Sequence, residues 1–374
     1  MELFDDNLVL PIVENEDTSS GETITQPFSP NDIKLSNPPM NLGDLIDMIT
    51  YGWIDFKTDY QRAEDLWSEE KQSRLIESAL LGLRLPAFYF EEVNKKHWRI
   101  IDGLQRCCAI RNYCVTQTLS LENLEFLDFN GRYYDNLSFE LKRDIRMLPI
   151  TVNLLNSGVP NKVKYILFKR LNTGGMELTP QEIRNAVFQG IAIDTVKRMA
   201  VNPQFLKSTG NKIPVKRMQD MDFVSRFIAF YLIGYENYFP DLENFINTAM
   251  ERINDSTYTD KQIDKMEEDF SKALSLAHNI FDDDAFRKRE DMSASRRPIN
   301  KAYFEVITTL FAKLSEDQCA HLLNNKEPFC KDLVDVMSTN KAYNNSFSGG
   351  TGRRDSVKRR FTIFQEVMSK YLSI

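Results

Sequence analysis

One short segment combines residue types that bind phosphate. Residues 98–106 read as an apolar strand that ends at Asp102-Gly103 and opens directly into a helix carrying Gln105 and Arg106. A glycine at such a turn lets backbone N–H groups at the helix N-terminus face an anion, while a guanidinium fork fits phosphate oxygens. The segment therefore predicts a phosphate site that lacks a Walker sequence. An alternative stays open, in which Asp102 only caps the helix and pairs with Arg106.

A second polar segment precedes another predicted helix. Thr179, Pro180 and Glu182 form a capping-box pattern with proline at the first helical position, which is a sufficient structural role for Glu182. The preceding run Asn172-Thr-Gly-Gly175 has one glycine more than a helix end needs, which favours a polar loop that closes over a ligand. Neither a P-loop nor a dinucleotide-binding fingerprint occurs in the sequence.

Two basic segments lie late in the chain. The first contains Arg287, Lys288 and Arg289 with Arg296 and Arg297. The second, residues 349–360, begins with glycines, and its part from 351 to 360 has five basic residues and one acidic residue, or +4. Phosphate binding and a solvated helix face both fit such segments, and the sequence leaves this choice open.

The charge distribution makes these local segments decisive for partner questions. The chain has 374 residues, of which 47 are basic and 54 acidic, for a net charge of −7. Seven of the acids lie within residues 1–22, which contain no Lys or Arg, so the remaining chain is balanced at 47 against 54 − 7 = 47. Net charge therefore excludes neither DNA nor other partners.

Other classes of protein are disfavoured by what the sequence lacks. It has no apolar run of the roughly 18 residues that a membrane span needs, and no signal-peptide pattern, so we expect a cytoplasmic protein. Five cysteines, two of them adjacent, predict reduced and mostly buried thiols. Three histidines and no Cys-x-x-Cys pair give little material for a zinc site, a His-metal nuclease or a Ser-His-Asp hydrolase.

The elements that must position these residues change in type along the chain. We predict a flexible or surface-draped acidic tail over residues 1–39, an α+β domain over residues 40–170 and a helical domain over residues 171–374. The predicted strands are Trp53–Phe56, Ala87–Glu91, Trp98–Ile101 and Ile150–Leu155. The clearest predicted helices begin after Ser68 and end at Gly82, follow Gly103 to about Thr116, and span Thr259–Phe281.

Taken together, an ordered series of motifs resembles the GmrSD restriction-endonuclease N-terminal domain family. The motifs are Asp59-Tyr-Gln-Arg62, Trp67-Ser68, Gln72-Ser-Arg-Leu-Ile76, Leu80-Leu-Gly82, Leu85-Pro86, Ile101-Asp-Gly-Leu-Gln-Arg106, Arg170-Leu-Asn-Thr-Gly-Gly175, Leu178 and Glu182-Ile-Arg184. The later segments around Pro298–Val306 and Gly350-Thr-Gly352 are similar to the helical continuation of stand-alone members.

The resemblance implies a fold and a function. The expected architecture is a small ParB/sulfiredoxin-like mixed α+β domain that binds nucleotide, followed by a larger all-α domain. The family's Asp-Gly-Gln-Gln-Arg motif, which binds and hydrolyses NTP and thereby gates DNA cleavage, falls on residues 102–106. Leu104 stands where the family usually has its first Gln. If this side chain faces the core the change is harmless, whereas if it faces the ligand a polar contact worth about 1 kcal/mol is missing.

The resemblance supplies the predicted catalytic and nucleotide-binding residues, and the second basic segment supplies the predicted DNA-binding residues. The catalytic residues are Asp102, Gln105 and Arg106, and Asp102 is also the metal ligand for a Mg²⁺ ion that accompanies the NTP. The nucleotide-binding residues are Gly103, Arg106, Gln61, Arg62, Asn172, Thr173, Gly174 and Arg184, and the DNA-binding residues are Arg353, Arg354, Lys358, Arg359 and Arg360.

Two functions remain at the sequence level. The first is a nucleotide-binding, NTP-hydrolysing, DNA-associated component of a bacterial restriction or phage-defence system that acts with a nuclease partner. The alternative is a non-catalytic DNA-binding or adaptor protein that uses its basic segments.

Overall fold

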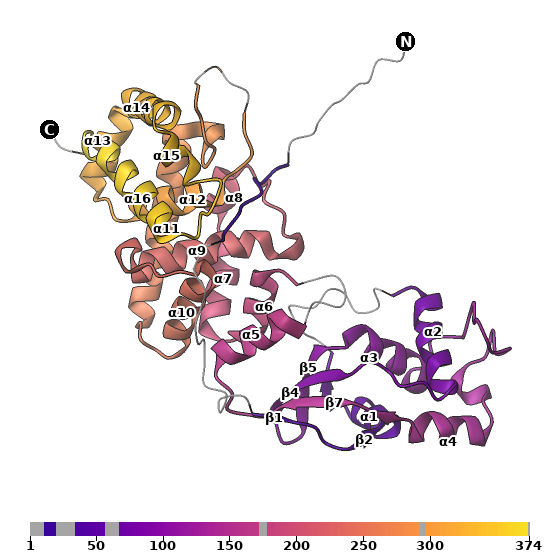
Figure 1. The fold of residues 1–374 in the computed structure, drawn as a ribbon. Helices are drawn as coiled ribbons and strands as arrows, with labels where there is room; N and C mark the ends of the chain where they lie inside the picture. Colours follow the sequence, from indigo (N-terminus) through magenta and orange to yellow (C-terminus); the bar gives the residue numbers. More distant parts are fainter. Residues whose placement is uncertain are drawn as a thin grey trace, which may run out of the picture. The chain divides into compact units, whose positions relative to one another are not determined.

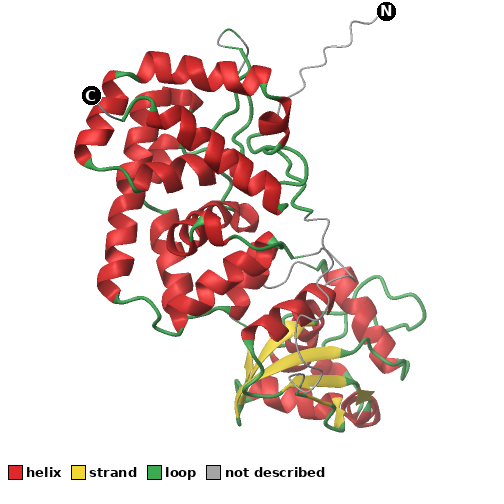
Figure 2. Cartoon of the chain, turned by 60° about the vertical axis from the view of Figure 1, so that its left-hand side comes forward, coloured by secondary structure: helices red, strands yellow, loops and turns green. Residues whose placement is uncertain are grey.

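The computed structural model describes residues 11–19, 34–56, 67–171, 178–291, 293 and 296–372. The chain divides into two compact units, one formed by residues 26–187 and the other by residues 188–374 together with residues 1–25. The first contains both sheets and the second is helical (Figures 1 and 2). The expected α+β domain followed by a larger helical region is therefore confirmed. The units divide at 187/188, whereas the sequence analysis placed this boundary at 170/171.

The α/β unit is built on a five-stranded mixed sheet with the order β1-β7-β4-β5-β3. Its centre is the antiparallel pair β4 and β5, and β7 and β3 add in parallel on either side. A separate antiparallel pair joins β2 to β6. The strands are β1 Leu35–Ser36, β2 Met40–Asn41, β3 Ile54–Asp55, β4 Phe88–Asn94, β5 His97–Asp102, β6 Pro149–Ile150 and β7 Val152–Leu155.

The helices of this unit agree with their sequence signals. Ser68 caps α2 as predicted, because its hydroxyl accepts a hydrogen bond from the Lys71 N–H. The helix after Gly103 continues to Val115, but its last turn, Arg111–Val115, is a π-helix that the sequence pattern did not predict. The helices are α1 Leu42–Thr50, α2 Glu69–Leu80, α3 Leu104–Ile110, α4 Phe139–Met147, α5 Asn161–Leu171 and α6 Pro180–Val187.

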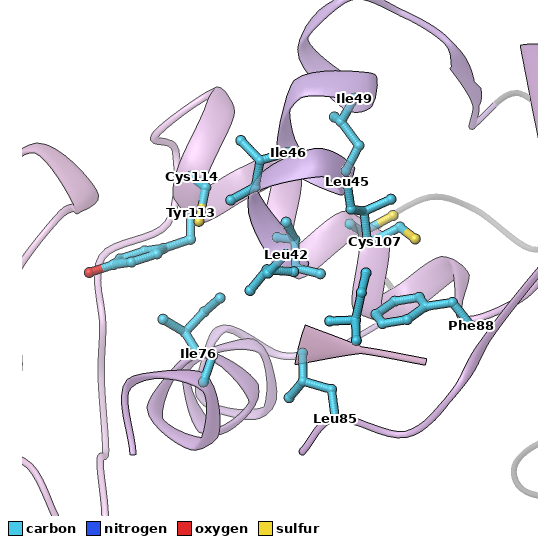
Figure 3. Packing of buried hydrophobic residues seen from close by; sticks show 14 of the residues in the cluster. Leu42, Leu45, Ile46, Ile49, Ile76, Leu85, Phe88, Cys107, Tyr113 and Cys114 are labelled. Atoms are coloured by element: carbon cyan, nitrogen blue, oxygen red, sulfur yellow. The ribbon is translucent and has the colours of Figure 1, made fainter. Parts of the chain in front are cut away.

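The core of the α/β unit lies between the sheet and helices α1 to α3. Leu42 and Leu45 of α1, Ile76 of α2, Phe88 of β4 and Cys107 of α3 pack together in it (Figure 3). Cys107, Cys108 and Cys114 are free thiols inside this unit, and all three are buried. Since α3 is part of this core, the residues at its start are held on a rigid element.

The helical unit is packed around α9, α11 and α12. The aromatic run that begins α9 is core, as its spacing indicates: Phe227 lies 4.5 Å from Phe270 of α11, and Phe223 lies 5.0 Å from Phe304 of α12, both between ring centroids. The helices are α7 Ile191–Ala200, α8 Pro203–Ser208, α9 Gln219–Ile233, α10 Leu242–Asn254, α11 Asp260–Phe281, α12 Lys301–Ala312, α13 Glu316–Asn324, α14 Lys326–Thr339, α15 Lys341–Asn345 and α16 Arg354–Ser369. Among the described residues, no helix is long and apolar enough to cross a membrane.

Residues 11–19, which we call the acidic strap, lie against the helical unit. Val13 forms a parallel β-bridge with Ile299, and the Thr351 N–H donates to the Asp17 carbonyl oxygen over 2.9 Å. Of the two alternatives for the tail, the contacts of residues 11–19 therefore favour a surface-draped segment, whereas residues 35–36 form strand β1 and do not belong to a tail. The reason is electrostatic: carboxylates that prevent the segment from forming its own core find cationic partners on the helical unit.

A cluster of buried charges joins three helices of this unit. Glu305 of α12 has no exposed side-chain surface and accepts a hydrogen bond from Arg360 Nε of α16 over 2.9 Å. Arg226 of α9, whose side chain is 3% exposed, lies 3.4 Å from the other Glu305 oxygen. Burial raises the pKa of Glu305, against the opposing effect of the two arginines. Each charge in the cluster therefore depends on its neighbours for compensation.

We expect the Glu305→Gln substitution to destabilise the helical unit by about 3 kcal/mol, because it leaves buried guanidinium charge without its anion. Urea denaturation of the full chain, followed by circular dichroism, measures the loss. Asp355→Asn is the matched control, since Asp355 is exposed and pairs with Arg359 at 3.6 Å. This change should cost less than about 1 kcal/mol. Equal effects of the two substitutions would contradict the assigned role of Glu305.

Candidate functional site

The candidate site is the turn between β5 and α3, formed by Asp102 to Arg106. Gly103 occupies the N-cap position with φ +105°, a conformation that residues with a side chain rarely adopt. A Cβ atom at this position would lie 3.0 Å from Cδ1 of Phe88. The turn therefore needs glycine both for its backbone conformation and for its close approach to β4.

Arg106 folds back onto the residue that ends β5. Its Nη2 donates to Asp102 Oδ2 over 2.6 Å, and its Nη1 donates to the Ala87 carbonyl oxygen over 3.1 Å. The guanidinium carbon lies 5.1 Å from the ring centroid of Phe88. The side chain of Asp102 is 39% exposed and that of Arg106 only 11%. The carboxylate is thus open to a ligand, while the guanidinium is held in a fixed orientation.

Gln105 connects the turn to the start of α2. Its Oε1 accepts a hydrogen bond from the Trp67 N–H over 3.1 Å, and the Trp67 carbonyl accepts one from Gln72 Nε2 over 3.0 Å. The Gln72 Oε1 accepts in turn from Asn112 Nδ2 over 3.0 Å. Gln72 is buried and Asn112 nearly so. This chain of hydrogen bonds fixes the amide orientation of Gln105 relative to two helices.

Gln72 and Asn112 are positioning residues that the sequence analysis did not identify. Gln72 belongs to one of the motifs that resemble the family, but the motif itself indicates no role for this side chain. Asn112 lies where α3 changes to the π-helix, a kind of irregularity that often occurs at functional sites. Glutamine and asparagine on a helix are usually interpreted as solvent-exposed, so the sequence pattern does not indicate that these two residues are buried and hydrogen-bonded.

Leu104 faces the core. Its side chain is 7% exposed and belongs to the hydrophobic cluster under the sheet. Of the two interpretations left open by the sequence, the first therefore holds: the replacement of the family's usual Gln takes no polar group away from the open side of the turn. The partly exposed residues of the motif are Asp102, Gln105 and Arg106, whereas Gly103 is buried.

Six further residues are predicted to bind nucleotide. Gln61, Arg62, Asn172, Thr173 and Gly174 lie outside the described residues.

Arg184, the last of the predicted set, lies on α6. It is fully buried and donates a hydrogen bond to Gln181. On the same helix, the predicted capping box is confirmed: the Thr179 N–H donates to Glu182 Oε2 over 2.6 Å, and the Glu182 N–H donates to Thr179 Oγ1 over 3.1 Å. The structure thus gives Arg184 and Glu182 contacts within α6 and its cap.

An open pocket of about 630 Å³ lies beside β3 and β5. Its charged lining residues include Asp55, Arg99 and Arg111. Arg99 pairs with Glu91 at 3.3 Å, and Glu91 accepts from Lys164 of α5 over 2.5 Å. The sequence analysis named none of these residues, because alternating charges along a strand are typical of a solvent-exposed face.

Metal binding has little protein support in the described part of the chain. Among the described residues, no group of three or more His, Cys, Asp and Glu side chains could hold a metal ion. Asp102 alone supplies a single open carboxylate. This donor set fits Mg²⁺ only in the form in which the ion arrives on phosphate groups, where one or two protein carboxylates suffice.

The second basic segment presents part of its charge to solvent at the start of α16. Arg353, Arg354 and Lys358 are exposed, and Arg359 is partly exposed beside Asp355. Arg360 is different, since its side chain has no exposed surface and binds Glu305. The prediction that Arg360 contacts DNA is therefore corrected: helical periodicity turns this residue inward, where it is an ion-pair partner.

The first basic segment is neutralised locally. Arg289 pairs with Asp284, and Arg296 pairs with Asp283 over 3.1 Å. Arg297 pairs with Glu290 over 3.0 Å. These carboxylates come from the acidic turn after α11 and from the segment itself. The contacts favour internal ion pairing over phosphate binding, and the described residues of the segment are not helical, so the solvated helix face predicted as the other alternative is absent there.

The fold and the turn define the class of this protein: a mixed-sheet domain with a strand–Asp-Gly–helix motif, continued by a helical region. Residues 42–189 match the sequence model described as "GmrSD restriction endonuclease, N-terminal domain". Residues 42–189 of the chain therefore form a domain of this kind. No curated protein matches the chain significantly. The assignment of a ParB/sulfiredoxin-like fold stays a prediction.

We expect Gly103→Ala to destabilise the α/β unit by about 3 kcal/mol, since it combines a positive φ with a collision against Phe88. Gly82→Ala is the control, because Gly82 has φ +71° with nothing within 4 Å of an added Cβ. That change should cost about 1 kcal/mol. Urea denaturation of both variants measures the difference, and a Gly103→Ala variant as stable as Gly82→Ala would refute the tight approach to β4.

Proposed function

We propose that the chain binds a nucleoside triphosphate at the β5–α3 turn and hydrolyses it. The match of residues 42–189 to the GmrSD N-terminal domain supports a role in a restriction or phage-defence system. The observation that carries the nucleotide proposal is the pairing of an open carboxylate, Asp102, with a fixed guanidinium, Arg106, at a glycine turn that begins a helix. Helix N-termini that begin after glycine, and oriented guanidinium groups, are both recurrent phosphate-binding features in proteins.

Arg106 is the phosphate ligand in this proposal. Its guanidinium is oriented by the Ala87 carbonyl and the Phe88 ring, and two of its nitrogens already form hydrogen bonds. A phosphate oxygen replaces or shares the contact with Asp102, because a doubly charged terminal phosphate is a stronger acceptor than a carboxylate. Because Gly103 has no side chain, the backbone of the turn lies close to Phe88 of β4, an approach that a side chain at this position would block.

Asp102 has the second role. Its side chain is exposed enough to meet a Mg²⁺ ion brought by the triphosphate, or to accept a proton from an attacking water. Mg²⁺ would supply charge neutralisation on the phosphate oxygens. Gln105 positions the nucleophile. The orientation of its amide is fixed by a hydrogen bond with Trp67, which is linked through Gln72 to Asn112. Leu104 in the core leaves these roles unaltered.

Asp102→Ala and Arg106→Ala should each weaken NTP binding at least about tenfold, because each removes a charged contact to the phosphates or their ion. Equilibrium binding and phosphate release with ATP, GTP and CTP plus Mg²⁺ measure the effect, with DNA present and absent. Arg143→Ala and Asp144→Ala are matched controls, since these two exposed residues also form an Arg–Asp pair. No binding of any of the three nucleotides by the native chain would refute the proposal.

A second candidate function is DNA binding at the start of α16. It is favoured by the exposure of Arg353, Arg354 and Lys358 within a few residues of one another. Guanidinium and ammonium groups arranged along a helix face contact successive phosphates without reading sequence. This function is compatible with the first, and it becomes the whole function if the β5–α3 turn binds no nucleotide.

Replacing Arg354 or Lys358 by Ala should weaken DNA binding and lower the slope of log affinity against log salt concentration by about 0.9 for each contact removed. A duplex titrated at several salt concentrations gives this slope. Lys265→Ala serves as control, because Lys265 is an exposed lysine that pairs with Asp269 on α11. DNA affinity that is unchanged in both α16 variants would exclude this surface.

A further inference from the structure

The acidic strap is bound like a peptide ligand. The Glu14 N–H donates to the Ile299 carbonyl over 2.8 Å, and the Ile299 N–H donates to the Ile12 carbonyl over 3.0 Å. At the other end the Asp17 carbonyl accepts the Thr351 N–H. Backbone pairing of this kind is how proteins add an extended peptide to an existing surface.

Each carboxylate of the strap meets a specific set of partners. Glu14 contacts Lys288 Nζ at 3.0 Å and accepts from Asn300 Nδ2 over 2.9 Å. Glu16 accepts two hydrogen bonds from Arg226, over 3.0 and 2.6 Å, and one from Thr351 Oγ1 over 2.5 Å. Asp17 Oδ2 accepts from the Gly350 N–H over 3.3 Å. Each of the three acidic residues in the Glu-x-Glu-Asp sequence thus has its own partners on the helical unit.

Polar contacts hold the strap, with little contribution from apolar burial. Its apolar residue Ile12 is 47% exposed, whereas the charged side chain of Glu16 is only 8% exposed. On the receiving side Arg226, Lys288 and Thr351 are all buried. This asymmetry is typical of a charged ligand on a preformed site and unlike a strand that belongs to a core.

The receiving site is one negative charge short without the strap. Arg226, Lys301 and Arg360 carry three positive charges, whereas Asp222 and Glu305 carry two negative charges within the same cluster. Glu16 is the third anion. Burial by itself would raise the pKa of Glu16, but Arg226 and Thr351 lower it below its usual value. The helical unit is therefore built to receive a carboxylate at this point.

Gly352 provides space for the strap. A Cβ atom at this residue would collide with the Thr18 carbonyl oxygen. The neighbouring Gly349 has nothing within 4 Å of an added Cβ. The glycine-led segment before α16, which the proposed functions do not use, thus has a steric reason to carry glycine at 352.

We propose that the surface formed by Arg226, Lys288, Asn300 and residues 350–352 is a recognition groove for an acidic peptide with the spacing Glu-x-Glu-Asp, and that residues 12–18 of the same chain fill it as an exchangeable ligand. An acidic segment supplied in trans competes for the same contacts. Exchange uncovers the N–H groups of Gly350 and Thr351 beside Arg353, so occupancy of the groove controls which anions reach the start of α16.

The test uses the full chain, folded with the strap in place. A protease recognition sequence inserted within residues 21–32 is cut after purification, and the N-terminal fragment carries a dye on its terminal amine. Fluorescence anisotropy then follows its displacement by an unlabelled peptide of residues 11–19. We expect the cut fragment to stay bound and to be displaced by this peptide. A Glu16→Gln peptide should compete at least about tenfold less well, since it loses the charge that Arg226 binds.

Two chain variants test the groove without changing any charge. Gly352→Ala should release the cut fragment, because its Cβ takes the place of the Thr18 carbonyl, and Gly349→Ala should retain it. Near-ultraviolet circular dichroism confirms that the helical unit of each variant is folded. Immediate loss of the native fragment after cleavage would overturn the proposal. A fragment that no peptide displaces, or equal competition by the Glu16→Gln peptide, would overturn it as well.

Discussion

A buried guanidinium must be compensated, and this requirement organises the β5–α3 turn. Arg106 is nearly enclosed, so its charge must meet an anion or oriented oxygen atoms. Asp102 supplies the anion because it ends β5 where α3 begins, and the Ala87 carbonyl is available because β4 starts beside it. The left-handed backbone at Gly103 brings these groups together. A phosphate that binds here enters an environment already shaped around one ion pair.

Buried guanidinium groups in the helical unit are also compensated by anions, in a larger cluster. Arg226 and Arg360 are both buried, and Glu305 lies between them. Glu16 completes this cluster from a distant part of the sequence. Buried ion clusters add little net stability compared with apolar packing, but they are sensitive to the loss of one member. This sensitivity is what makes a carboxylate on a short strap an effective ligand.

The sequence predicted local structure better than it predicted contacts between distant residues. The strands around β4 and β5, the cap at Ser68 and the capping box at Thr179 follow from patterns within a few residues, and each is present. Arg360 could not be assigned from the sequence alone, because its basic neighbours Lys358 and Arg359 read as one surface patch. Only the three-dimensional packing of α16 against Glu305 shows that it points inward. The contacts of the acidic strap could not be predicted for a similar reason, since its partners lie about 200 or more residues away along the chain.

The proposed binding of a nucleoside triphosphate at the β5–α3 turn can be measured directly. Hydrogen–deuterium exchange of the native chain, with and without Mg²⁺–NTP, tests it at the level of individual segments. We expect nucleotide to slow exchange in peptides covering residues 101–107 and in the adjoining start of β4, because ligand contacts stabilise the turn. Nucleotide-dependent protection that is absent from this turn, or confined to the helical unit, would exclude the turn as the binding site.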